Sequence, residues 1–274
     1  MSKADPRVVS AIVALLEDEL SCTARRPIVL GICGSQGSGK STLAVALAEK
    51  LEEDGRTCEI LSLDDLYLPK SARERLAREV HPLLATRGPP GTHDVSLGIE
   101  VIDLLRAGSS VALPRFDKAR DDRAVPSDWP RVEENCDVLL FEGWCVGAVP
   151  QDHADLAQPI NDLEALEDTD GVWRRHTNTA LAGSYQDLFS RIDRLVLLQA
   201  PGFEVVCDWR MQQEHDLRAA HPDGSQLMDD GQVARFVQHY ERITRHILAE
   251  MPPRADLLVS LDAGRNPVSI LPRT

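Results

Sequence analysis

Short, almost uninterrupted apolar runs recur along the chain, and longer amphipathic stretches separate most of them. They predict strands near 28–33, 58–63, 110–113, 137–142, 194–199 and 256–261. Runs such as Val138-Leu139-Leu140-Phe141 do not alternate with polar residues, which is typical of parallel strands covered on both faces. Strands that alternate with helices predict an α/β fold, a three-layer sandwich with helices flanking a mostly parallel central sheet. Ligands bind such sheets beyond the carboxyl ends of the strands, so the residues that follow each strand are candidates for function.

Two long stretches depart from this alternation. Residues 64–94 are rich in Pro, Gly, His and Arg, and residues 114–131 carry closely spaced charges of both signs. Structureless loops of this length are uncommon in a compact domain unless they are functional or disordered. No low-complexity bias or internal repeat supports disorder. We therefore predict one domain over residues 1–274, in which these two stretches are insertions that contribute to the site.

Composition narrows the classes of function. The chain has 274 residues, is 43% hydrophobic and carries a formal net charge of −14. A basic face is the usual footprint of nucleic-acid binding, so this charge argues against a nucleic-acid partner. No run approaches the roughly 18 apolar residues of a membrane span, and residues 7–20 resemble an amphipathic surface helix instead of a signal peptide. The six cysteines lack metal-ligand spacing. Cys33, Cys58 and Cys136 fall in or beside predicted strands, which favours reduced thiols and a cytoplasmic location.

A glycine-rich run follows the first predicted strand. Residues 31–42 read Gly-Ile-Cys-Gly-Ser-Gln-Gly-Ser-Gly-Lys-Ser-Thr, and the Gly-x-x-x-x-Gly-Lys-Ser spacing is that of a phosphate-binding P-loop between a strand and a helix. Its glycines let backbone N–H groups turn toward one anion, and the following helix aims its positive end there. The alternative is a plain Gly/Ser turn. The predicted ATP-binding residues are Gly34, Ser35, Gln36, Gly37, Ser38, Gly39, Lys40, Ser41 and Thr42. Lys40 is expected to reach the β- and γ-phosphates, and the Ser41 hydroxyl to bind Mg²⁺.

Carboxylates follow two further strands. Asp64 and Asp65 lie in the run Ser62-Leu63-Asp64-Asp65-Leu66-Tyr67. We interpret Asp64 as the residue that accepts a proton from an attacking hydroxyl or helps to hold Mg²⁺ through water, and Asp65 as bonded to the neighbouring loop. The alternative is a helix N-cap. Glu142 closes the apolar run 138–141 in the Walker B pattern, in which the carboxylate orients metal-bound water. Ser41, Asp64 and Glu142 are thus the predicted metal-side residues.

The two insertions supply groups that suit a small, anionic acceptor of a phosphoryl group. The first carries Arg87, Thr92, His93 and Asp94, although Asp94 is equally well placed to cap a helix starting near Val95. The second concentrates cations just after the third predicted strand, where they can stabilise the charge of a transferring phosphoryl group. These cations are Arg115, Lys118, Arg120 and Arg123. The alternative is a solvated network in which they pair with the interleaved Asp117, Asp121 and Asp122.

A helix is predicted near residues 203–220, after the fifth strand. It carries Arg210 and Arg218, and a lid helix in this position can supply arginines that close over ATP and exclude water. The alternative is an exposed basic helix face.

Together these motifs resemble the phosphoribulokinase/uridine kinase group of P-loop kinases, and within it the plant-type D-glycerate 3-kinases with their bacterial and fungal relatives. The resemblance rests on residues 34–42, 62–67, 87–94, 114–118, 122–123, 141–144 and 209–214, and the closing run 255–262 is similar too. It implies a P-loop NTP hydrolase-like fold and transfer of the ATP γ-phosphoryl group to a primary hydroxyl, with D-glycerate as the acceptor. Leu66 stands where the family often has Phe, and the loop 114–123 looks shorter than in the plant enzymes.

By this resemblance Asp64 takes the place of the catalytic base and Glu142 that of the metal-side carboxylate, with Lys40 and Arg210 stabilising the transferred group. The expected acceptor-binding residues are Asp65, Tyr67, Arg87, Thr92, His93, Asp94, Arg115, Lys118 and Arg123. Two alternatives stay open: a kinase of another small alcohol, such as pantothenate or a nucleoside, and a non-catalytic ATP-binding regulatory protein. Against the latter, the chain has no Asn-Lys-x-Asp guanine-recognition motif and no Leu-Ser-Gly-Gly transporter signature. The sequence makes no prediction of oligomeric state.

Overall fold

A six-stranded sheet forms the centre of the molecule. The computed structural model describes residues 4–133, 135–220 and 228–273, apart from the side chains of residues 217–220. The strand order is β10-β9-β8-β1-β7-β2. The strands are β1 (Ile28–Gly34), β2 (Cys58–Ser62), β7 (Val138–Gly143), β8 (Arg194–Gln199), β9 (Leu257–Leu261) and β10 (Pro267–Pro272). All neighbours are parallel except β9 and β10, which pair antiparallel.

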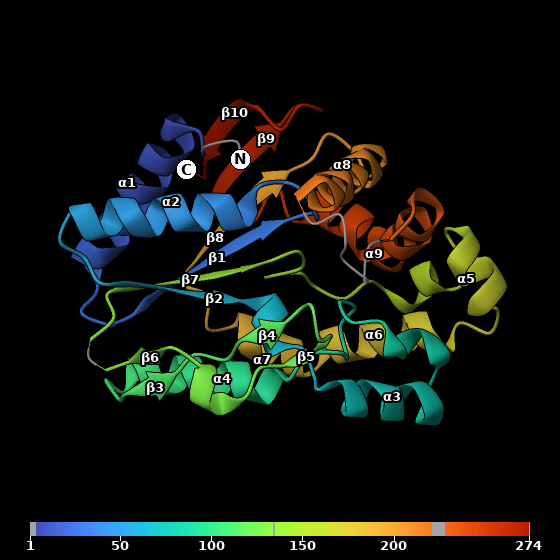
Figure 1. Ribbon diagram of the computed structural model, residues 1–274. Helices are drawn as coiled ribbons and strands as arrows, with labels where there is room; N and C mark the ends of the chain where they lie inside the picture. Colours follow the sequence, from blue (N-terminus) through green and yellow to red (C-terminus); the bar gives the residue numbers. More distant parts are fainter. Residues whose placement is uncertain (1–3, 134, 221–227, 274) are drawn as a thin grey trace.

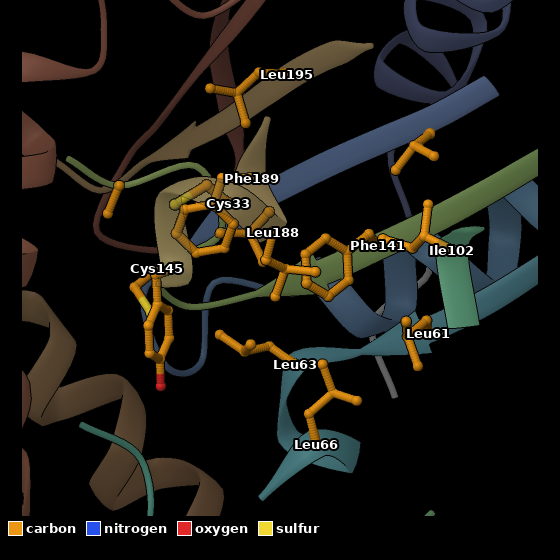
Figure 2. Close-up of a cluster of buried hydrophobic side chains, with 14 of the residues drawn as sticks. Cys33, Leu61, Leu63, Leu66, Ile102, Phe141, Cys145, Leu188, Phe189 and Leu195 are labelled. Atoms are coloured by element: carbon orange, nitrogen blue, oxygen red, sulfur yellow. The ribbon is translucent and has the colours of Figure 1, made fainter. Parts of the chain in front are cut away.

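Helices cover both faces of this sheet (Figure 1). On one face lie α1 (Pro6–Cys22) and α2 (Lys40–Glu53), and on the other lie α4 (Val95–Arg106) and α7 (Ser184–Phe189). Successive residues of β1 serve the two layers in turn: Ile28 packs with α1 and α2, whereas Val29 packs in the cluster shown in Figure 2. This period of two in a strand buried on both faces explains its continuous apolar sequence. The predicted three-layer α/β fold is confirmed.

The remaining helices lie toward the carboxyl ends of the strands or flank the sheet. They are α3 (Lys70–Glu79), α5 (Asp162–Glu167), α6 (Val172–Ala182), α8 (Glu204–Ala220) and α9 (Asp230–Glu250), with 3₁₀ turns η1 (Leu63–Leu66), η2 (Pro82–Ala85), η3 (Pro126–Asp128) and η4 (His153–Leu156). Helix α8 confirms the helix predicted near residues 203–220. Helix α1 confirms the amphipathic helix, since Val8, Ile12 and Leu16 are buried along one side.

The strand predicted near residues 110–113 is not part of the central sheet. Only β3 (Val111–Ala112) forms there, and it pairs antiparallel with β6 (Arg131–Val132) in a separate two-stranded ribbon. The run is apolar because Val111 and Leu113 join the hydrophobic cluster that includes α4. Pro114 follows directly, and because it has no N–H group it cannot continue a ladder of strand hydrogen bonds. A short apolar run that packs beside a helix has the same sequence pattern as a central strand.

The two long stretches are folded rather than structureless. The first contains η1, α3 and η2, and the second contains the ribbon of β4 (Phe116–Asp117) and β5 (Asp122–Arg123). Arg73 of α3 is only 2% exposed. Its guanidinium donates to the backbone carbonyls of Leu68 (3.2 Å), Ala85 (2.8 Å) and Asp121 (2.7 Å). This one side chain therefore ties both insertions into a single unit beside the carboxyl end of β2.

The cysteines are all free thiols. Cys33 and Cys136 are buried, and Cys58 is half-buried, as expected from their places in or beside strands. Burial raises the pKa of Cys33 to about 12, so its thiol stays protonated. In the part of the chain that the structure describes, no helix combines the length and the apolar character needed to cross a membrane.

Candidate active site

The P-loop has the backbone conformation that phosphate binding requires. Strand β1 ends at Gly34 and α2 begins at Lys40, so the loop runs directly into the amino end of a helix. Gly37 and Gly39 have φ angles of 76° and 89°, a region that favours glycine. A Cβ atom on Gly37 would lie 2.7 Å from the Cβ atom of Trp209 in α8. The absence of a side chain at Gly37 therefore lets α8 pack against the loop.

Three polar side chains of the loop have buried oxygen atoms without hydrogen-bond partners among the described residues. Ser35 and Ser38 are each 5% exposed. Their hydroxyls, and the side-chain oxygen of Gln36, are buried and have no hydrogen-bond partner among the described residues. Buried polar atoms are usually paired, so unpaired ones in a phosphate loop indicate a site shaped for a ligand.

Glu142 lies next to this loop because of the strand register. It is the fifth residue of β7, beside Ile32 of β1 and Ser62 of β2. The Ser41 hydroxyl donates to Glu142 Oε1 across 3.0 Å. Glu142 Oε2 is buried and lacks a partner in the described structure. The Walker A hydroxyl and the Walker B carboxylate therefore meet, as their motifs predict.

Asp64 lies at the same edge of the sheet, in the 3₁₀ turn η1 that directly follows β2. The Tyr67 hydroxyl donates to Asp64 Oδ1 (2.7 Å), and the Lys118 ammonium donates to Oδ2 (2.7 Å). Burial by itself would raise the pKa of Asp64, but Lys118, with help from Tyr67 and from the charge of Lys40, lowers this pKa to about 2. Asp64 is therefore ionised at neutral pH. The charge of Lys40 contributes to this lowering, so Asp64 lies within electrostatic reach of the P-loop lysine.

The remaining predicted cations pair with carboxylates of the first insertion more than with their sequence neighbours. Arg115 lies 3.5 Å from Asp65, and Arg123 donates to Asp94 across 3.0 Å. Asp65 also accepts the backbone N–H of Phe116 (3.0 Å), which confirms that it bonds the neighbouring loop. Arg87 of the first insertion pairs in turn with Asp121 of the second. The interleaved network that stood as the alternative is thus largely replaced by pairs between the two insertions.

Two predicted acceptor residues are used to build the loop. Asp94 caps α4 by accepting the Leu97 N–H (3.2 Å), which is the alternative role the sequence offered. The Thr92 hydroxyl donates to the Pro89 carbonyl (2.7 Å) and accepts the Gly88 N–H (3.0 Å), and the residue is fully buried. Thr92 therefore shapes the turn that presents its neighbour His93.

His93 packs directly against Tyr67, the residue that contacts Asp64. Its ring stacks on Tyr67, with ring centroids 4.8 Å apart, and its Nδ1 lies 2.6 Å from the hydroxyl of Tyr185 in α7. Burial lowers the pKa of His93 to about 3, so the ring is neutral. Its Nε2 is buried without a partner in the described part of the chain.

The comparisons with known proteins identify the group to which this site belongs. The family model called Phosphoribulokinase / Uridine kinase family matches residues 29–164. Over 244 residues the chain is 37% identical to the uncharacterized kinase mug58 of Schizosaccharomyces pombe, an alignment that covers 85% of each protein. The chain belongs to the phosphoribulokinase/uridine kinase family.

Two further relatives are both named as D-glycerate 3-kinases. The chloroplastic D-glycerate 3-kinase of Arabidopsis thaliana is 31% identical over 262 residues, which span 88% of this chain and 54% of that protein. The solved structure of D-glycerate 3-kinase from Cryptococcus neoformans superposes with a TM-score of 0.81 at 26% identity, covering 96% of this chain and 98% of that one. The protein is thus a P-loop kinase that uses ATP, as its motifs indicate.

In this kinase the predicted lid arginine has protein partners in α8 and α9. Arg210 pairs with Glu214 one turn along α8 (2.7 Å), and its guanidinium lies over the ring of Phe236 in α9, 5.8 Å from the centroid. Its role at the phosphates stays a prediction. Arg218 lies among the residues whose side chains are outside the described structure.

Helices α7 and α9 contribute residues that sequence reasoning missed. Tyr240 donates to the Arg87 carbonyl (3.0 Å) and meets the Trp144 ring edge-on at 4.9 Å. Tyr240 and Tyr185 both lie on amphipathic helices, where an aromatic residue has the pattern of an ordinary core position. A different hollow, of about 450 Å³, lies at the amino ends of β8 and β9. Its charged residues, Asp193, Arg194, Arg254 and Asp256, are engaged with protein partners.

Proposed function

We propose that this kinase transfers the γ-phosphoryl group of ATP to a hydroxyl of D-glycerate. The identity to the plant D-glycerate 3-kinase and the likeness to the fungal structure support this acceptor. The observation that carries the proposal is the Asp64–Lys118 pair, which joins a carboxylate base to a cation on an exposed turn. The carboxylate can accept the proton of the acceptor hydroxyl, and the lysine can leave Asp64 to pair with the carboxylate of the acceptor.

Mg²⁺ is proposed as the metal. The fit rests on Ser41 and Glu142, whose oxygens are of the kind that Mg²⁺ prefers, and on Glu142 Oε2, a buried acceptor without a partner among the described residues. When bound with ATP, the ion neutralises charge on the phosphates. Lys40 and the backbone N–H groups of the loop hold the triphosphate, and Glu142 orients the ligands of the ion.

The acceptor is proposed to bind by exchanging ion pairs. Lys118 is 62% exposed, so its side chain is free to turn from Asp64 to the carboxylate of an entering acceptor. Once Lys118 leaves, only Tyr67 and Lys40 still oppose the effect of burial, and the pKa of Asp64 rises. The carboxylate thus becomes a stronger base at the moment when the acceptor hydroxyl reaches it. Because the transition state of phosphoryl transfer is loose, positioning the hydroxyl contributes more than its deprotonation.

A coupled assay tests the acceptor directly. ADP formation from Mg²⁺·ATP is measured with D-glycerate, L-glycerate, glycerol, pantothenate and uridine, and the phosphorylated product is identified by mass and ³¹P NMR. We expect D-glycerate to give the highest kcat/KM and neutral glycerol a far lower one. Faster turnover of pantothenate or uridine would replace the acceptor, and ATP hydrolysis that no acceptor accelerates would favour a regulatory ATP-binding protein.

Replacing Lys118 by methionine should weaken the acceptor and alter the pH profile. Loss of one charge-assisted contact is expected to raise the KM for D-glycerate by about 10- to 100-fold, with the KM for ATP unchanged. In the wild type, Asp64 is ionised down to about pH 2, so it sets no acid limb near neutrality. In the variant the pKa of Asp64 rises because the ion pair and hydrogen bond of Lys118, the main causes that lower it, are lost, and the acid limb of kcat/KM moves to higher pH.

The matched control is Arg120→Met, which removes another exposed cation from the same turn. It should leave both KM values and the pH profile close to wild type. If Lys118→Met behaves like this control, Lys118 neither binds the acceptor nor sets the ionisation of Asp64.

A further inference from the structure

Tyr185 forms a short hydrogen-bond chain with the loop that carries His93. The Gly91 N–H donates to the Tyr185 hydroxyl oxygen across 3.0 Å, and this oxygen lies 2.6 Å from His93 Nδ1. Tyr185 is 1% exposed and His93 5% exposed, so water does not compete for these groups. Tyr185 reaches the loop from α7, on the face of the sheet that packs against α4.

The direction of this chain follows from counting protons. A phenol has one proton, and its oxygen here already accepts from Gly91. Burial raises the pKa of Tyr185, which keeps that proton in place. His93 Nδ1 is the one acceptor recorded for it among the described residues, so Nδ1 holds the lone pair and the ring proton resides on Nε2. With the proton on Nδ1 instead, the buried tyrosine proton would have no acceptor, and Nε2 would still be without a partner among the described residues.

The histidine ring lies beside Tyr67, the residue that contacts Asp64. Tyr67 and His93 form an antiparallel β-bridge, and opposed residues in such a bridge project from the same face. Their rings lie nearly parallel, with 29° between the planes. The hydroxyl at the far end of Tyr67 contacts Asp64, and the charge of Asp64 also acts on the pKa of His93, so the imidazole lies within electrostatic reach of the same carboxylate. It is a buried N–H donor with no partner among the described residues.

We propose that Tyr185 is a positioning residue for the acceptor: by fixing the proton of His93 on Nε2, it aims a neutral N–H donor at an oxygen of the acceptor beside Asp64. This inference rests on the proposed function and adds a residue to it. The donor serves a carboxylate oxygen, which has no proton of its own, while Asp64 accepts from the hydroxyl. Nε2 is buried in this arrangement, so a side chain or loop beside it must move before the acceptor can reach it.

Nitrogen NMR reads the tautomer without any turnover. The protein is labelled with ¹⁵N-histidine, and the resonance of His93 among the eight histidines is assigned by its loss in His93→Gln. We expect a neutral ring with the proton on Nε2 at neutral pH, a shift of Nε2 on adding D-glycerate, and loss of the fixed tautomer in Tyr185→Phe. A proton on Nδ1, or a charged ring, overturns the proposal.

A double-mutant cycle separates positioning from structural support. Tyr185→Phe should raise the KM for D-glycerate about tenfold with the KM for ATP unchanged, and His93→Gln, which keeps an N–H donor, should lose less than His93→Phe. In the His93→Phe background, Tyr185→Phe should add little, because the hydroxyl acts through the imidazole. An equal penalty in both backgrounds would mean that the hydroxyl acts through Gly91 alone, and the proposal would fall.

Tyr240→Phe is the matched comparison, since it removes another buried hydroxyl that holds the same loop through the Arg87 carbonyl. Its effect should be the same with or without His93→Phe. The two levels of inference fail separately. If D-glycerate is not phosphorylated although Nε2 carries the proton, the proposed acceptor is wrong. If D-glycerate is phosphorylated but Nδ1 carries the proton, the role of Tyr185 is wrong.

Discussion

Replacing Asp64 by asparagine should lower kcat for the acceptor by about two to four orders of magnitude, the usual contribution of a positioned base. An asparagine keeps the size of the side chain and an oxygen for the Tyr67 hydroxyl, but it accepts no proton and offers Lys118 no charge. The P-loop and Glu142 are untouched. The dissociation constant of ATP, measured by titration calorimetry, should therefore stay within a few-fold of wild type.

Asp65→Asn is the matched control, because the two carboxylates are adjacent in η1. Asp65 accepts the Phe116 N–H and pairs with Arg115, so its loss should loosen the second insertion and raise the KM for the acceptor. Its kcat should remain far above that of Asp64→Asn. Near-full activity of Asp64→Asn would remove this residue from the mechanism, and a reversed order of the two variants would make Asp65 the base.

The nucleotide half of the site could be predicted from the sequence because its chemistry is local. The cradle is one contiguous run from Gly34 to Ser41, and its strand and helix are its immediate neighbours. Glu142 and Asp64 could be assigned for a related reason. Parallel strands bring their carboxyl ends to one edge, so residues that end separate strands meet even when they are far apart in the chain.

The acceptor half could be predicted as residue types but not as pairings. The sequence put Arg123 beside Asp121 and Asp122, yet the fold pairs it with Asp94. Charge partners depend on how α3 and the β4–β5 ribbon pack together, and that packing has no periodic signal of its own. The misplaced strand near residues 110–113 has a similar cause, since three apolar residues do not specify whether their neighbour is a helix or a sheet.

Arg73 and Tyr185 had no signal at all. Arg73 lies in the charged run Lys70–Glu79, where an exposed arginine is the ordinary expectation. Its burial follows from three carbonyls that converge from different segments, and only the folded chain brings them together. The proposed role of Tyr185 depends on its hydroxyl proton, which is donated to His93 because the hydroxyl oxygen accepts from Gly91. Arg73 contacts the second insertion, and Tyr185 contacts the loop before α4. In both places the local sequence says little about which distant residues will be in contact.

Arg73→Met should cause the largest loss of stability among the variants considered. Methionine fills much of the space, but it leaves the partly buried carbonyls of Leu68, Ala85 and Asp121 without their donor. Loss of three hydrogen bonds from a buried, charged donor costs about 3–5 kcal/mol. For a chain of this size that corresponds to a fall in Tm of roughly 10 °C, measured by calorimetry or circular dichroism.

The same variant also separates the two halves of the site. Arg73 holds the insertions together but does not contact the P-loop, so the folded fraction of Arg73→Met should bind ATP normally while the KM for the acceptor rises. Arg75→Met, an exposed position on the same helix, is the control and should change Tm by no more than about 1–2 °C. Equal Tm values for the two variants would show that the carbonyls find other partners. A parallel loss of ATP and acceptor binding would show that the insertions and the P-loop unfold as one unit. It would contradict the expectation that the insertions lose their structure before the P-loop does.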